Sequence, residues 1–152
     1  MTSSVSSGTK IVPLMSSGTA GPLGAIHLPR LWTKLTLAAV RALPDGYDSA
    51  GAGFDQMTID ALNLKRDEVI AYVTERKPTY VQFEAWVLEK NGGSIPKSAI
   101  DAHNAAIRGY HHSDELGATM RAASGVKDDS IKDAVTLNML EDLDEFYSAV
   151  SK

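Results

Sequence analysis

The feature that most constrains the fold is the spacing of apolar residues, which recur every three or four positions in short segments. Glycine or proline ends each segment, as at Pro44 and Gly46. The spacing extends furthest in the last segment, at Ile131, Val135, Met139, Leu143, Phe146, Tyr147 and Val150. No stretch alternates apolar and polar residues with β-branched enrichment, so no sheet is expected. The sequence therefore predicts an all-α fold.

Helix start and stop signals divide the chain further. Pro29 suits a first helical turn, and Thr79 with Gln82 forms a capping-box pattern. Ser113 is a typical N-cap, and Gly125 follows its segment as a typical helix stop. Together these signals predict a compact bundle of about seven short helices.

Length and composition indicate one domain with a distinct beginning. A chain of 152 residues buries enough surface for a conventional core. Residues 1–24 are rich in Ser and Gly and repeat Ser-Ser-Gly-Thr, which is typical of low complexity. We therefore expect an extended N-terminal arm over 1–24 and a single helical domain over 25–152.

Several classes of protein are excluded by composition. The chain has no cysteine, which removes disulfides, thiolate nucleophiles and thiolate metal sites. No apolar run approaches the roughly 18–20 residues that a spanning helix needs, and the first residues lack the basic and apolar regions of a secretory signal. The net charge of −4 argues against nucleic acid as a partner. We expect a cytoplasmic protein without membrane or nucleic-acid contacts.

The charges are unevenly distributed along the chain. No acid precedes Asp45, whereas 128–145 is rich in acids. The simpler interpretation is that the basic first helix packs near the acidic last one, or that both faces are solvated. The alternative is a positive pocket in an otherwise acidic protein.

The strongest candidate site lies in the segment from Gly21 to Lys34. His27, Arg30 and Lys34 are three and four positions apart, which places them on one helix face if the helix begins by about Ile26. The glycines before them leave backbone N–H groups free to bind an anion. Arg30 and Lys34 are therefore predicted to bind substrate, and His27 to transfer a proton. The alternative is a capped helix with an exposed basic face.

Three further residues complete the predicted site. Asp55 is either the N-cap of a short helix or a carboxylate facing the basic cluster. Tyr47 either adds a phenol to the pocket or covers the core from a turn. Trp32 is added as a substrate-binding candidate, although its spacing is equally typical of a core residue. We predict His27, Asp55 and Tyr47 as catalytic residues, with no cofactor.

The remaining histidines raise the question of a metal. His111 and His112 are adjacent, and neighbouring side chains diverge in a helix or strand, so they rarely bind one ion together. His103 falls on an apolar stripe, as a buried core histidine does. A polar loop is the preferred interpretation of 111–115, and no metal site is predicted; the alternative is a metal-dependent hydrolase in which His111 or His112 contributes one ligand together with His103 or a distant carboxylate.

Four stretches carry a resemblance to a known family. The segment Gly24–Lys34, with its core His27-Leu28-Pro29-Arg30-Leu31, resembles the opening motif of a bacterial family catalogued as domain of unknown function 5069. Similar stretches follow in the same order, at Phe54-Asp55 with Leu62, at Glu84–Val87 and at the acidic ending Leu140–Glu145. The resemblance spans about 21–146. Thr33 stands where members of that family often carry Asp, and the N-terminal arm is longer than usual.

The resemblance implies a small helical bacterial domain whose activity has not been established. It also makes His27, Arg30, Lys34 and Asp55 better site candidates, because packing alone does not require polar residues at these positions. It names no reaction and no cofactor.

Two functional hypotheses follow, and the sequence does not decide whether the chain is an enzyme. The first is a small cofactor-free lyase, isomerase or hydrolase that uses acid–base chemistry on a compact anionic metabolite. The second is a non-catalytic binding or assembly module that uses the N-terminal arm and the acidic last helix, with a homodimer as one form.

Overall fold

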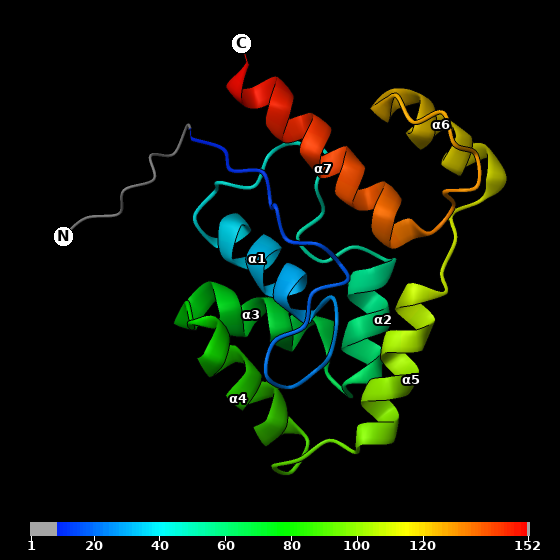
Figure 1. The fold of residues 1–152 in the computed structure, drawn as a ribbon. Helices are drawn as coiled ribbons and strands as arrows, with labels where there is room; N and C mark the ends of the chain where they lie inside the picture. The colour runs from blue at the N-terminus through cyan, green and yellow to red at the C-terminus, as the bar shows by residue number, and fades with distance from the viewer. Residues whose placement is uncertain (1–8, 152) are drawn as a thin grey trace.

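The structure is a computed structural model that describes residues 9–151, and within this range it contains seven helices (Figure 1). This confirms the all-α prediction and the expected number of helices. The helices are α1 (Leu28–Ala39), α2 (Phe54–Ala61), α3 (Arg66–Arg76), α4 (Tyr80–Lys90), α5 (Lys97–Arg108), α6 (Asp114–Ser124) and α7 (Ala134–Val150). No helix in 9–151 is long and apolar enough to cross a membrane.

The helix ends follow the capping residues. Thr79 and Gln82 form the predicted capping box at α4, and the Ser113 side chain accepts from the backbone of Leu116 at α6. The last helix starts later than its apolar spacing suggests. Its N-cap is Asp133, which accepts from the backbone N–H of Thr136, so the preceding residues stay outside the helix.

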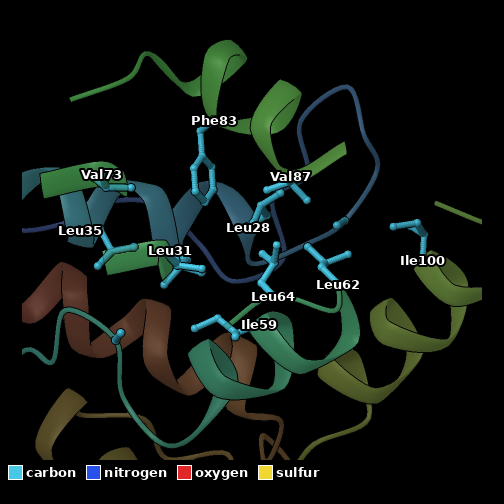
Figure 2. Packing of buried hydrophobic residues seen from close by; sticks show 13 residues of the cluster. Leu28, Leu31, Leu35, Ile59, Leu62, Leu64, Val73, Phe83, Val87 and Ile100 are labelled. Carbon is cyan, nitrogen blue, oxygen red and sulfur yellow. The ribbon is translucent and has the colours of Figure 1, made fainter. Parts of the chain in front are cut away.

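The main core lies between α1 and the helices that pack on it, α2, α3 and α4 (Figure 2). Leu28, Leu31 and Leu35 form the buried stripe of α1, and Phe83 of α4 packs against them with almost no exposed surface. The polar residues Arg30 and Lys34 lie on the adjacent face of α1. The apolar face therefore fixes the orientation of α1, and with it the direction of the three predicted site residues.

The N-terminal segment, residues 9–24, contains no helix; its first part runs between α1 and α7, and it then loops to reach Glu84 of α4 through Leu23 (Figure 1). Its backbone carbonyls at Pro13 and Met15 accept hydrogen bonds of 3.0 and 2.9 Å from Arg30. Pro13 and Ser17 are buried. This part of the predicted arm is therefore packed into the domain, while the part before residue 9 lies outside the described residues.

Helix α7 turns a different face inward from the one its apolar spacing suggests. Its buried residues are Ala134, Leu137 and Asp142, whereas Leu143, Phe146 and three other apolar residues are exposed. The exposed fractions are 38% for Met139, 46% for Leu143, 41% for Phe146, 66% for Tyr147 and 64% for Val150. From Met139 onward, the longest apolar stripe of the sequence thus faces outward.

Candidate functional site

A cavity of about 300 Å³ lies against the polar face of α1. The loop 46–53, the first turn of α2, the segment after α5 and the inner face of α7 complete its wall. Of the predicted site residues, His27, Arg30, Lys34, Tyr47 and Asp55 line it, together with Gly46, Asp48, Gly51, Ala52, Gly53, Phe54, Met57, Tyr110, His112, Asn138 and Glu141. Five of the six predicted residues therefore meet at one cavity.

Asp55 joins two of these residues into a buried cluster. Its Oδ1 atom lies 2.6 Å from His27 Nε2, and its Oδ2 atom accepts from Lys34 Nζ at 2.5 Å. The backbone N–H of Gly51 donates to the same Oδ2 at 2.8 Å. Each of the three side chains is at most 9% exposed. The carboxylate thus receives donors from the N-cap of α1, the second turn of α1 and the glycine-rich loop.

The Asp55 pKa reflects these donors. Burial alone would raise it, but the hydrogen bond from His27 and the positive charge of Lys34 hold it below the usual value. Asp55 is the second residue of α2, and the N-cap is Gly53, so the N-cap interpretation was wrong. The other interpretation, a carboxylate facing the basic cluster, is confirmed.

His27 occupies an unusual backbone position. It is the N-cap of α1 rather than a helical residue, and its φ of 70° lies in the left-handed region that glycine adopts freely. Such strain persists only where the surroundings enforce it, and it is concentrated at functional sites. Here the conformation accompanies an imidazole whose two nitrogens both have hydrogen-bond partners.

The imidazole of His27 is neutral in this network. Burial lowers its pKa further than the neighbouring Asp55 raises it. Because a carboxylate only accepts, we assign the ring proton to Nε2, and Nδ1 then accepts from the Ser17 hydroxyl at 3.0 Å. Ser17 is buried and does not line the cavity. It therefore positions His27 and is not an accessible nucleophile.

Arg30 makes a second buried ion pair, one turn before Lys34. Its guanidinium donates to both carboxylate oxygens of Asp142, at 2.6 and 3.1 Å, in addition to the two carbonyls of the N-terminal segment. The expectation that the basic first helix packs near the acidic last one is confirmed by this pair. Most of the donors of Arg30 are thereby engaged within the protein, which leaves few for a ligand.

Tyr47 approaches the same carboxylate from the loop. Its hydroxyl donates to Asp142 Oδ1 at 2.9 Å, and it is half-buried on the cavity wall. Burial and the charge of Asp142 raise its pKa well above the ordinary phenol value. The phenol therefore keeps its proton at neutral pH, which suits a hydrogen-bond donor better than a base.

The α7 side of the cavity was not found from the sequence. The Oδ1 atom of Asn138 accepts from His112 Nε2 at 3.0 Å, and Glu141 lines the cavity with them. Burial and the neighbouring Asp142 raise the pKa of Glu141. These residues continue the inner face of α7 that begins at Ala134, three and four positions apart. That spacing is the sequence signal that could have located them.

Two predicted features lie elsewhere. Trp32 packs edge-to-face with Tyr80 at 5.8 Å and donates to the carbonyl of Pro78, so it belongs to the core on the other side of α1. The N–H of Leu23, in the glycine-bearing loop before α1, donates to Glu84. The glycine loop that does line the cavity is the later one, 46–53.

The remaining histidines are placed apart. His103 is 4% exposed and its Nε2 hydrogen-bonds the carbonyl of Ile26 at 2.9 Å, as expected for a buried core histidine. His111 is exposed and pairs with Asp133 through the backbone. Among residues 9–151, no group of three or more potential ligands gathers to hold a metal ion.

Comparison of the chain with protein-family models, curated proteins and solved structures finds no match. The resemblance to domain of unknown function 5069 therefore stays a prediction.

Proposed function

We propose that this chain is a small enzyme that transfers a proton on a compact metabolite bearing an anionic group. The observation that carries the proposal is the convergence of His27, Lys34 and Asp55, from different elements, in one buried hydrogen-bonded cluster on a cavity wall. Buried titratable groups that perturb one another in a cavity are typical of active sites. The volume lies at the lower end of the range for small-molecule sites, which favours a compact ligand.

In this proposal Lys34 holds the anionic group. Within 9–151, Asp55 is the one hydrogen-bond acceptor of its ammonium group, and an ammonium has three N–H donors. Donors that remain are available to a carboxylate or a similar group in the cavity. Arg30 supports the wall through Asp142 and contributes its charge at a distance.

Asp55 then becomes the base. An anion bound to Lys34 shares the ammonium group and adds a negative charge nearby, and both effects raise the pKa of Asp55. The carboxylate can then accept a proton from the ligand, while the Nε2–H of His27 fixes its orientation. Proton abstraction of this kind begins eliminations and isomerisations, and a water molecule in place of the C–H group gives hydrolysis. Tyr47 positions the neighbouring wall.

A binding screen combined with proton exchange tests this proposal before the substrate itself is identified. Carboxylates and phosphates are first screened by thermal shift. A ligand at about 100 times its Kd stabilises the fold by roughly 2.7 kcal/mol, which moves the Tm by about 5–10 °C. Ligands that bind are incubated in D2O, and loss of C–H signals is followed by proton NMR.

Two variants separate binding from chemistry. Lys34→Gln should abolish the thermal shift, whereas Asp55→Asn should keep binding and stop deuterium incorporation. Lys127→Gln changes an exposed lysine away from the cavity and serves as the matched control. Deuterium incorporation or turnover that survives in Asp55→Asn would overturn the assignment of Asp55.

A second candidate function, partner binding or assembly, is favoured by the exposed apolar stripe of α7. The stripe includes Leu143, Phe146 and Tyr147, and α7 itself contains acids but no lysine or arginine. Light scattering at micromolar concentration tests self-assembly. A dimer that the double substitution Leu143→Glu/Phe146→Ser converts to a monomer supports it, and a wild-type monomer removes it.

A further inference from the structure

The sequence offered a positive pocket as one interpretation, but the cations that line the cavity are already paired with carboxylates. Both lining cations already face carboxylates, Lys34 with Asp55 and Arg30 with Asp142. Two other lining carboxylates, Asp48 and Glu141, are exposed to solvent at the rim and receive no hydrogen bond and no ion pair from any residue within 9–151. The unpaired charges of the cavity are therefore negative.

These carboxylates and Lys34 belong to different parts of the wall. Lys34 projects from α1 toward the start of α2, where Asp55 and the loop N–H of Gly51 meet it. Glu141 comes from the inner face of α7, next to Asp142, and Asp48 comes from the loop. The lining thus offers hydrogen-bond donors on the α1–α2 side and unpaired acceptors on the α7 and loop sides.

Aromatic rings add to the attraction for a cation. Phe54 and Tyr110 lie edge-to-face at 5.5 Å, and both line the cavity with Tyr47. The faces of such rings carry negative charge density and attract an ammonium group. A cationic group in the cavity would therefore find both carboxylates and rings.

Ligands of a single charge fit this wall poorly. A phosphate or a dicarboxylate would place its charge beside the unpaired carboxylates of Asp48 and Glu141. A simple amine would leave the spare N–H donors of Lys34 facing a like charge. Only a ligand that carries a negative and a positive charge complements both the Lys34 side and the Glu141 side of the cavity.

We propose that the cavity binds a compact zwitterion, an amino acid or a close relative, with its carboxylate on Lys34 and its ammonium group on Glu141. Asp48 adds a second negative charge on the ammonium side. This inference rests on the proposed function, because it uses the same cavity and the same anion-binding lysine. It names the ligand class that the proposed function leaves open.

Calorimetric titration with matched ligands tests the inference. The panel contains the protein amino acids and their β- and γ-amino counterparts, each beside the acid that lacks the amine and the amine that lacks the carboxylate. At least one amino acid should bind about tenfold or more tightly than both of its single-charge analogues. Equal affinity for an amino acid and its amine-free acid would overturn the zwitterion.

Variants on α7 then locate the ammonium group. Glu141→Gln should weaken amino-acid binding by about tenfold and leave the affinity for the amine-free acid unchanged. Asp144→Asn makes the equivalent change on a residue of α7 that is exposed like Glu141 but lies outside the cavity, and it should change neither. Equal effects of the two substitutions would place the ammonium elsewhere and overturn the assignment.

The outcomes separate this inference from the proposed function. Amine-free acids that bind in a Lys34-dependent way, with no preference for amino acids, refute the zwitterion and leave the proposed function intact. Absence of binding by every member of the panel up to 10 mM (a limit of about 2.7 kcal/mol in affinity) refutes the zwitterion as well. Loss of binding in Glu141→Gln but not in Lys34→Gln contradicts both.

Discussion

Arg30 and Lys34 stand one turn apart on α1, and each directs a buried cation at a carboxylate on another helix. The Arg30 pair is surrounded by protein, because two backbone carbonyls and the Tyr47 hydroxyl complete its hydrogen bonds. Both cations line the cavity, but within 9–151 Lys34 has a single protein acceptor, Asp55, and keeps N–H donors for a ligand. Two pairs of similar composition therefore have different roles: the first joins α1, α7 and the N-terminal segment, and the second faces a space where a ligand can bind.

The difference follows from the chemistry of the two cations. A guanidinium has five donors in a fixed plane, so Arg30 can bind a carboxylate with two hydrogen bonds and still reach carbonyls. An ammonium is a compact charge with three donors that rotate freely, so Lys34 can exchange partners at lower cost. Arginine therefore suits the fixed ion pair with Asp142, and lysine suits an ion pair whose partner can be exchanged for a ligand.

The largest expected effect comes from breaking the Arg30 pair. Arg30→Met leaves Asp142 buried without its cation and releases the carbonyls of the N-terminal segment. We expect a loss of roughly 3–5 kcal/mol in the free energy of unfolding, and a Tm lower by about 6–20 °C. Urea unfolding measures the change. The double variant Arg30→Met/Asp142→Leu should recover much of the loss, and a double variant as unstable as the single one contradicts this account.

Asp55→Asn should cost less. It removes the negative charge from a buried Lys34, but the amide oxygen can still accept a hydrogen bond and water in the cavity can solvate the ammonium. We expect a loss of about 1–3 kcal/mol by the same urea measurement. If Asp55→Asn destabilises the protein as much as Arg30→Met, the two ion pairs do not differ in the way described above.

The pH dependence of stability distinguishes the two sites further. The folded-state pKa of His27 lies below its unfolded value of 6.5, so between these values the unfolded chain binds the extra proton. Stability from His27 is therefore present above pH 6.5 and is lost as the pH falls toward its folded pKa, by up to about 1.4 kcal/mol per pH unit. His27→Gln should flatten this slope between pH 7 and 5.

Two other groups must be separated from His27 in that experiment. His103 is also buried with a lowered pKa and gives a slope of the same sign, so His27→Gln is measured in a His103→Gln background. The Asp55 contribution is present above its unfolded pKa of 3.8 and is lost only as the pH falls below that value. A slope between pH 7 and 5 that is the same with and without His27 would show that its imidazole is not held neutral.

Sequence reasoning located one side of the cavity and missed the other for a physical reason. Arg30 and Lys34 could be grouped because residues four apart share a helix face, and His27 was grouped with them by the same spacing although it is the N-cap. Helical spacing alone could not show which face of α7 points into the protein. The apolar stripe of that helix is the stronger pattern, but the Arg30–Asp142 pair turns a polar face inward, and that contact joins residues far apart in sequence.

Residue roles were harder to predict than positions. Arg30 fits the pattern of an anion-binding residue, yet its donors go to Asp142 and to two carbonyls of the N-terminal segment. A low-complexity segment gives no sign that its backbone will supply acceptors. The fold class could be predicted from local patterns, whereas the division between the fixed and the exchangeable ion pair depended on tertiary contacts.

The smallest expected effect sharpens the comparison with an exposed pair. Lys97 and Asp101 lie one turn apart on α5 with an N–O distance of 2.7 Å, close to the 2.6 Å of Arg30–Asp142, but their side chains are 87% and 58% exposed. Water already solvates both charges and salt screens them, so Lys97→Gln should change the free energy of unfolding by less than about 0.5 kcal/mol. Urea unfolding in low and high salt measures it. A change as large as that of Asp55→Asn would mean that distance, rather than burial and the number of partners, sets the energy of the ion pairs on this fold.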